Sequence, residues 1–407
     1  MTLGIDDMRA VAGYENFLRP ILERLKKIDG RAPVSILTCR IAPDDPQVQK
    51  WLKEGVTIEV HTLTHPCPLL HQGKFEQAAN VVHGGVDLLS QIKGNTPVAY
   101  RMPCCDSMNS LSPRFFAEIF NKTSPAGRYL QIDSSVFNIT NSKDKSLPPS
   151  LVVDADGNER FAKYLSKMKS YVGTIENYPY PYVIDRLCWE FPCVVPSDWE
   201  AQNLIGNQKP QMLEDWQRAL DATVLKQGTF NFVFHPHGWV KNTQMIEWID
   251  HITAKHGNRV KFLSFREARE RLTSNLLGGQ PLRAANGQDN GVRLLDMNND
   301  GYMDMFLTNL LKSDDDRAVI YRNLGDMSFE RVHVPALDAF KYDYKNVGLA
   351  SSGTFVDYDG DGDQDALVAN TSQNSVSVLQ NDGSGGFSVA STVAVGTNPI
   401  SVTMSDI

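Results

Sequence analysis

The stretch Val56-Thr-Ile-Glu-Val60, followed directly by His61-Thr-Leu-Thr-His65, decides how the sequence up to about Leu277 can be interpreted. The run 56–60 is apolar and rich in β-branched residues, which predicts a buried strand. Two histidines four residues apart follow it, and on a turn or a first helical turn their imidazoles can face one point. We therefore expect two metal ligands at the carboxyl end of this strand and a third from elsewhere in the chain.

A pair of aspartates can supply the third ligand. The run Thr2-Leu-Gly-Ile5 reads as a strand, and Asp6 and Asp7 follow it. Adjacent side chains diverge, so one carboxylate can bind a metal while the other accepts a proton from water. Taken alone, the pair would also suit the start of a following helix. Together with His61 and His65, Asp7 completes a His₂Asp set of the kind that binds zinc and similar divalent ions.

Residues 1–277 alternate apolar runs with longer amphipathic stretches, ending in a predicted strand at 260–264 and a predicted helix at 266–272. This repeated β–α alternation predicts a parallel sheet or barrel. In such folds, polar residues at the carboxyl ends of strands are the catalytic candidates. Residues 138–182 are less regular and predict an insertion or a long loop beside the site.

Other predicted strand ends carry an arginine and two histidines. Arg101 follows the run Val98–Tyr100 and could hold the base carboxylate in a bidentate pair that keeps it ionised. The run Phe230–Phe234 ends in His235-Pro-His237. Either histidine could protonate a leaving amine, and a satisfied core position is expected for the other. His237 is also a candidate substrate contact.

Substrate contacts are expected from residues between these motifs. Asp198-Trp199 could contribute to an aromatic wall for a sugar ring, although a single tryptophan also fits a core position. Backbone amides near Cys104 could hold an oxyanion. Cys67 and Cys104 lie beside proposed site residues, and we expect them to pack rather than to bind metal. The spacing of the six cysteines assigns no disulfide.

Length and composition limit the remaining classes. A chain of 407 residues predicts two or three domains, and its net charge of −8 argues against nucleic acid as a partner. No apolar run is long enough to span a membrane. The glycines and proline of Leu277-Gly-Gly-Gln-Pro281 indicate a linker, so we expect a catalytic domain over 1–277, a linker over 278–290 and a different domain over 291–407.

The region 291–407 contains an internal repeat of roughly 60 residues. Each copy reads as a strand, an oxygen-rich loop, a second strand and a glycine-containing hairpin, and such loops predict Ca²⁺ binding because acidic side chains at alternate positions surround one point. The expected calcium ligands are Asp296, Asn298, Asp300 and Asp304 in the first copy and Asp357, Asp359, Asp361 and Asp365 in the second. A third copy breaks off at Ile407, so we expect the sequence to be a fragment at this end. The abrupt start predicts the same at the other end.

In chain order, four motifs of the first domain resemble those of the polysaccharide deacetylases, carbohydrate esterase family four: Asp6-Asp7, His61-Thr-x-Thr-His65, Arg101-x-Pro103 and a late strand ending in His235. The resemblance covers roughly residues 1–275 and implies a distorted (β/α) barrel, a divalent metal that is usually zinc, and hydrolysis of acetyl groups on sugars. By position, it implies the base Asp6, the metal ligands Asp7, His61 and His65, the base-orienting Arg101 and the acid His235.

The sequence departs from that family at three points. Gly4-Ile-Asp-Asp-Met8 stands where the first motif usually reads Thr-Phe-Asp-Asp-Gly, and Cys104 stands where an aromatic residue usually follows the proline. The fourth motif has no clear match, and Asp198-Trp199 is the candidate for it. Histidine followed by proline resembles the branch that includes allantoinase-like amidohydrolases and some peptidoglycan deacetylases. The departures leave the substrate class open. Residues from about 290 resemble the FG-GAP (VCBS) repeats of integrin-type propellers, which bind calcium and are usually extracellular.

These observations predict a secreted or cell-surface, metal-dependent hydrolase that removes acetyl groups from an N-acetylated or O-acetylated polysaccharide. The repeats would bind Ca²⁺ and anchor the enzyme to a cell-surface or matrix ligand. One alternative is hydrolysis of a small amide or cyclic imide, which a closed pocket would favour over an open groove. Another is an inactive carbohydrate-binding or adhesion protein, which the retention of both aspartates, both histidines and Arg101 disfavours.

Overall fold

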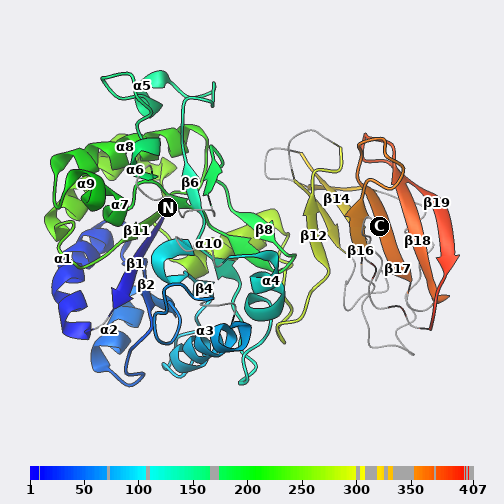
Figure 1. Ribbon diagram of the computed structural model, residues 1–407, viewed down its shortest axis with the longest axis horizontal. Helices are drawn as coiled ribbons and strands as arrows, with labels where there is room; N and C mark the ends of the chain where they lie inside the picture. Colours follow the sequence, from blue (N-terminus) through cyan, green and yellow to red (C-terminus); the bar gives the residue numbers. More distant parts are fainter. Residues whose placement is uncertain are drawn as a thin grey trace. The chain divides into compact units, whose positions relative to one another are not determined.

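The first strand, β1 (Thr2–Met8), lies inside an 11-stranded sheet with the order β7-β6-β10-β11-β1-β2-β3-β4-β5-β9-β8. Its neighbours are β2 (Val34–Thr38) and β11 (Asn231–Phe234), and both pairings are parallel. Every other pairing in this sheet is also parallel, except that of β8 with β9. The sheet curls into an incomplete barrel, which confirms the predicted α/β class (Figure 1).

The computed structural model describes residues 1–8, 10–70, 74–106, 111–165, 174–298, 303–307, 319–324, 329–332, 353–370, 373–397, 399 and 402. These residues form two compact units, Met1–Glu270 and Arg271–Ile407, which are described separately below. The remaining strands of the first unit are β3 (Thr57–Val60), β4 (Ala99–Tyr100), β5 (Ile132–Asp133), β6 (Phe137–Ile139), β7 (Thr174–Glu176), β8 (Tyr182–Ile184), β9 (Cys188–Glu190) and β10 (Cys193–Val194).

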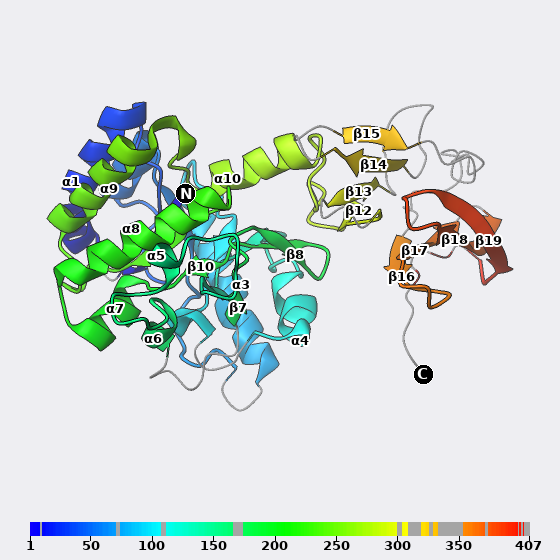
Figure 2. The ribbon, with the colours of Figure 1, turned by 90° about the horizontal axis from the view of Figure 1, so that it is seen from above.

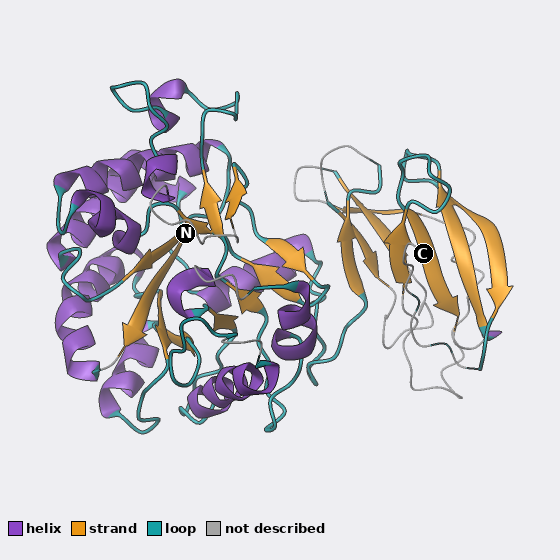
Figure 3. Cartoon of the chain, in the orientation of Figure 1, coloured by secondary structure: helices purple, strands orange, loops and turns teal. Residues whose placement is uncertain are grey.

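Helices cover the outside of the sheet (Figure 3). The α-helices are α1 (Val11–Asp29), α2 (Pro46–Glu54), α3 (Phe75–Leu89), α4 (Pro113–Phe115), α5 (Pro149–Val152), α6 (Ala162–Leu165), α7 (Asp198–Ile205), α8 (Pro210–Leu225), α9 (Asn242–His256) and α10 (Phe265–Arg271). A short 3₁₀ turn, η2 (Pro103–Asp106), follows β4, and π-helical turns η3 (Phe116–Phe120) and η5 (Leu272–Leu276) extend α4 and α10.

The packing of α1, α9 and α8 shows why these elements form where they do. Leu18, Ile21 and Leu25 of α1 recur at helical spacing and are fully buried, as a helix that covers a sheet requires. The helix ends at Gly30, whose φ of 70° few other residues adopt readily. Trp248 of α9 packs with its ring centroid 4.6 Å from that of Phe232 in β11. The three helices lie side by side (Figure 2).

Three features of the first unit differ from the prediction. The expected strand at 260–264 is reduced to a single bridge between Thr2 and Leu263. The described part of 138–182 is more than a loop, because β6 and β7 extend the sheet beyond β10. Helices α7 and α8 were not predicted, although the reciprocal hydrogen bonds of Ser197 and Glu200 at the start of α7 form a capping box that the sequence contains.

The second unit consists of two four-stranded antiparallel sheets, one for each complete repeat that the sequence predicts. The first contains β12 (Val292–Leu295), β13 (Asp304–Leu307), β14 (Val319–Asn323) and β15 (Phe329–Val332), and the second contains β16 (Gly353–Val356), β17 (Asp365–Asn370), β18 (Ser375–Asn381) and β19 (Phe387–Ala394). A shared core includes Phe306 from the first sheet and Leu379 from the second. Asp300 and, apart from Val402, the segment 400–407 of the third copy lie outside the described residues.

Candidate active site

The three side chains that the sequence predicts as metal ligands lie close together at the carboxyl ends of β1 and β3. Asp7 Oδ1 lies 3.2 Å from His61 Nε2 and 2.8 Å from His65 Nε2. His61 Nδ1 lies 2.8 Å from the carbonyl oxygen of Arg101, which can only accept, so Nδ1 carries the proton and Nε2 presents its lone pair to Asp7.

The cluster fits a divalent cation. One ligand atom from each of Asp7, His61 and His65 lies within 4.8 Å of the other two. Asp7 Oδ1 is buried, and its contacts with the two imidazoles lack hydrogen-bond geometry, so this oxygen is without a hydrogen-bond partner. Burial raises the pKa of Asp7, but the contacts with the surrounding histidines outweigh it and hold the pKa well below its usual range. Two imidazole nitrogens and an ionised carboxylate suit zinc or a similar ion.

His237 contacts this cluster rather than the interior of the neighbouring cavity. Its Nε2 lies 3.3 Å from Asp7 Oδ2, the carboxylate oxygen that faces away from His61 and His65. The sequence suggested a substrate contact for His237. The structure instead places it where it can orient the Asp7 carboxylate.

The proposed base, Asp6, is buried beside Arg101, and both side chains are almost completely shielded from solvent. Arg101 Nη1 donates to Asp6 Oδ1 at 2.6 Å, while Nη2 donates to Ser134 Oγ at 2.7 Å and Nε to the Ser134 carbonyl oxygen at 3.0 Å. The arginine thus gives Asp6 one hydrogen bond rather than the predicted two, and Ser134 holds the rest of the guanidinium. Gly4 leaves the space that this guanidinium fills.

His235, at the end of β11, forms a buried pair with Asp198, the first residue of α7. His235 Nδ1 lies 2.8 Å from Asp198 Oδ1, and the backbone N–H of His235 donates to Asp198 Oδ2 at 2.7 Å. Burial lowers the pKa of His235, but the Asp198 carboxylate outweighs it and raises the pKa to about 9. The sequence suggested that Asp198 touches substrate; it is fully buried and positions His235 instead.

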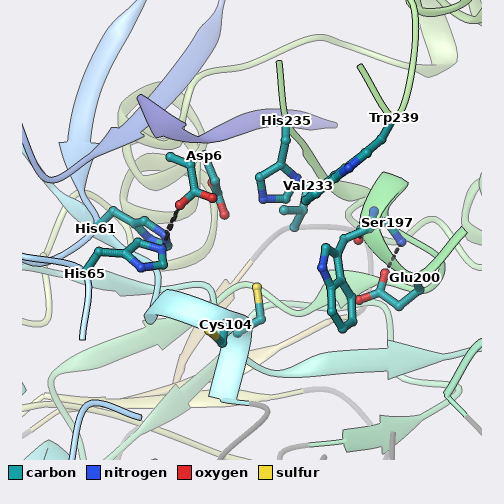
Figure 4. Close-up of a pocket in the computed structure, with 12 residues that line it drawn as sticks. Asp6, His61, His65, Cys104, Ser197, Glu200, Val233, His235 and Trp239 are labelled. Carbon is teal, nitrogen blue, oxygen red and sulfur yellow. Dashed lines mark hydrogen bonds and ion pairs between the residues drawn. The ribbon is translucent and has the colours of Figure 1, made fainter. Parts of the chain in front are cut away.

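A cavity of about 160 Å³ joins these groups (Figure 4). It is lined by Asp6, Asp7, His61, His65, Cys104, Cys105, Ser197, Trp199, Glu200, Val233, His235 and Trp239. The labelled histidines point into it from two sides, with Asp6 between them (Figure 4). Trp199 lines the cavity as the sequence suggested. No described residue of 138–182 does so, so the expected role of that segment beside the site is not seen in the described part of the chain.

A disulfide joins Cys67 to Cys104, with a Cα–Cα distance of 6.2 Å. The sequence favoured packing over metal binding for both cysteines and assigned no disulfide; in the structure they are bonded to each other. The two lie 37 residues apart in a chain with six cysteines, so spacing offered no signal for this pair.

The acidic loops of the two repeats show two kinds of aspartate. Carboxylate oxygens of Asp357, Asp359 and Asp361 lie within 4.8 Å of one another at the surface, as a cation site requires. Asp365 is buried, and its two oxygens accept the N–H groups of Tyr358 and Asn381, each at 2.8 Å.

The first repeat follows the same plan. Asp304 is buried and accepts the N–H groups of Met297 and Asn323 at 2.9 and 2.7 Å. Asp296 and Asn298 are half-buried at the start of this loop.

The chain matches one family model and several solved structures. A family model for FG-GAP-like repeats matches residues 296–368 and 357–407, which confirms the repeats predicted for the C-terminal region. A comparison with curated proteins gives no match.

Solved structures that resemble the chain are deacetylases and an allantoinase. Peptidoglycan deacetylase PdaC from Bacillus subtilis is 14% identical, with 68% of this chain and 94% of that chain covered and a TM-score of 0.34. A family 4 carbohydrate esterase from Streptomyces lividans, in complex with acetate, is 13% identical over 65% of this chain and 90% of that chain, with a TM-score of 0.33. Puue allantoinase is 10% identical, with 65% of this chain and 75% of that chain covered and a TM-score of 0.40. At these identities and TM-scores, we infer the chemistry from the residues of this chain alone.

Proposed function

We propose that this protein is a metal-dependent hydrolase that removes acetyl groups from an N-acetylated polysaccharide. The observation that carries this proposal is the meeting of three groups at one cavity: the Asp7–His61–His65 cluster, the Asp6 carboxylate held by Arg101, and the His235–Asp198 pair. A hydrolase of amides needs an activated water, a base for its proton and an acid for the leaving amine. Each of the three groups suits one of these tasks.

The residues divide the work as follows. A divalent ion held by Asp7, His61 and His65, for which we propose zinc, would polarise the acyl carbonyl and make water more acidic. Asp6 accepts the proton of the attacking water, and the buried guanidinium of Arg101 holds that carboxylate in position. His235 then gives a proton to the leaving amine, and Asp198 holds its ring and favours the protonated form.

Two features of the cavity support a sugar substrate. Trp199 and Trp239 line it, and flat aromatic surfaces suit the apolar faces of sugar rings. Cys104 and Cys105 have φ values of 63° and 42°, so their turn differs from ordinary helix or strand, and both residues line the cavity. We propose that this turn stabilises the oxyanion of the attacked acetyl group.

We propose that the repeats bind Ca²⁺ through Asp357, Asp359 and Asp361 and attach the enzyme to a surface that carries its substrate. An extracellular or cell-surface location is supported by the FG-GAP-like match and by the Cys67–Cys104 disulfide, because disulfides persist in oxidising compartments. Among the described residues, no helix combines the length and the apolar content needed to cross a membrane.

The test is acetate release from chitin oligomers, peptidoglycan and acetylated xylan by metal-stripped protein, with and without added zinc. We expect zinc-dependent release from one polymer. We also expect Asp7→Ala, His61→Ala and His65→Ala to lose both bound zinc and activity, while the control His251→Ala, on the outer helix α9, keeps both.

Three results would overturn parts of the proposal. If the ligand variants keep zinc and activity, the metal site is wrong. If zinc binds but no polymer releases acetate, the polysaccharide substrate is wrong, and hydrolysis of a small amide or cyclic imide becomes the better assignment. Absence of zinc binding would refute the catalytic site as a whole.

A further inference from the structure

The backbone around the cavity is held in an unusual conformation. Five non-glycine residues that form or adjoin the site have positive φ angles: Asp7, Thr62, His65, Cys104 and Cys105, with values from 42° to 66°. L-residues seldom adopt this left-handed conformation, and it persists only where the surroundings impose it. The turns that carry His65 and Cys104 therefore need contacts that hold them in place.

The turn from His61 to Cys67, which we call the histidine turn, has such contacts in its first part. His61 Nδ1 donates to the Arg101 carbonyl oxygen, and the backbone N–H of His65 donates to Thr62 Oγ1 at 3.0 Å. Gly85 of α3 lies against the same turn, since a Cβ built there would be 2.9 Å from the carbonyl carbon of Thr62. Beyond His65, Pro66 and Pro68 are half-buried and Cys67 is exposed, and the chain is buried again at Leu69.

The turn after β4 is anchored from the other side. The Met102 N–H donates to Ser135 Oγ at 2.9 Å, and the Ser135 hydroxyl donates to Asp133 Oδ1 at 2.7 Å. The Cys105 N–H donates to the Met102 carbonyl oxygen at 2.9 Å. Cys104 therefore belongs to a turn that is fixed to the buried sheet. A bond from Cys104 to Cys67 also restrains the end of the histidine turn.

We propose that the Cys67–Cys104 disulfide is a positioning crosslink for the metal site. It ties the turn that carries the ligand His65, two residues from Cys67, to the anchored turn that lines the cavity. His65 is the most exposed of the three proposed ligands, with 27% of its side chain accessible against 15% for Asp7 and 2% for His61. The crosslink therefore acts mainly on His65 and keeps its Nε2 beside Asp7. This inference rests on the proposed metal site.

The test is the zinc affinity of the Cys67→Ala/Cys104→Ala double variant, measured by competition with a chromogenic chelator. Loss of groups that orient ligands weakens metal binding by roughly tenfold to 100-fold, and we expect a loss in that range. Cys39→Ala removes a buried cysteine outside this disulfide and should leave the affinity unchanged. A folded double variant that binds zinc as tightly as the wild type would overturn the inference while leaving the proposed function intact.

A second measurement needs no variant. Coupling between two events is reciprocal, so bound zinc must protect the disulfide if the disulfide supports zinc binding. The wild-type protein is equilibrated in glutathione redox buffers, in which two glutathione thiols are oxidised to glutathione disulfide as the protein disulfide is reduced to two thiols, and the protein thiols are alkylated and counted by mass spectrometry. We expect a smaller reduced fraction of this bond at equilibrium in saturating zinc. An equal reduced fraction with bound zinc would refute the crosslink, and a wild type that binds no zinc would refute the metal site and this inference together.

Discussion

Replacing Gly4 by alanine tests whether Asp6 is held in place by a guanidinium that packs against bare backbone. A methyl group at Gly4 would lie 2.8 Å from Arg101 Nη1, 2.9 Å from Arg101 Nη2 and 3.2 Å from Leu37 Cδ1. Ordinary contact begins near 3.4 Å, so the guanidinium would have to retreat by about 0.6 Å. The end of an arginine side chain usually moves easily, but here Asp6 and Ser134 hold it by hydrogen bonds on three of its nitrogens.

The size of this shift sets the expected loss of stability and of turnover in Gly4→Ala. Overpacking of a buried site costs about 1–3 kcal/mol, and complete separation of the buried Arg101–Asp6 pair would cost about 3–5 kcal/mol. We expect the smaller range, because a shift of this size stretches the pair without removing either partner. A base displaced by a fraction of an ångström to 1 Å should lower the turnover by roughly 100-fold, or about 2.7 kcal/mol of activation free energy.

Urea unfolding followed by circular dichroism measures the free energy of unfolding, and acetate release measures turnover. Gly13→Ala is the matched control, because Gly13 is exposed in α1 and no other atom would lie within 4 Å of its added Cβ. In a helix this change should be neutral or stabilising by up to about 1 kcal/mol, with activity unchanged. If Gly4→Ala behaves like Gly13→Ala in both assays, Arg101 is not confined as described.

Three further predictions concern protonation and metal ions. His235 must be protonated to act as an acid, so activity should fall as pH rises through its pKa. That pKa is about 9 in the metal-free protein and lower beside a bound cation, and Asp198→Asn should move the falling limb to lower pH in a pH–rate profile. An Asp198→Asn profile that superimposes on the wild type would contradict the pairing. His237→Ala should weaken zinc binding by roughly tenfold without abolishing it, as measured by chelator competition, because it removes the contact to Asp7 Oδ2; unchanged affinity would refute that role. Ca²⁺ should raise the unfolding temperature of the repeats, and Asp361→Asn should reduce that rise in calorimetry; an equal rise would place the ion elsewhere.

Much of the site was predictable because parallel strands deliver their following residues to one edge of a sheet. The motifs at the carboxyl ends of β1, β3, β4 and β11 lie far apart in sequence, yet the chemistry of each suggested a role from the sequence alone. The side chains that hold these groups were harder to foresee. Ser134 supports Arg101 with a hydroxyl and a carbonyl oxygen, and such contacts depend on tertiary placement rather than on a local pattern.

Other parts of the fold escaped prediction for specific reasons. The 260–264 segment has the apolar pattern of a strand, but in the structure only Leu263 forms a bridge, to Thr2. Helix α8 begins with Pro210 at its first position and buries Trp216, two signals that the sequence contains and that were overlooked. The role of Asp198 could not be read from its neighbours, because its partner His235 lies 37 residues further along the chain.

The buried aspartates of the repeats bear on how such a module would respond to calcium. Asp365 and Asp304 each bind two backbone N–H groups, one from their own loop and one from the end of the next strand. These bonds brace the ends of the loops from within the protein, so an ion would not be the sole support of their shape. Removing calcium would then leave the shape of the surface largely intact and add two negative charges at Asp357, Asp359 and Asp361. Calcium would then act mainly by changing the charge of this surface. That charge would set whether the module prefers a positively or a negatively charged partner.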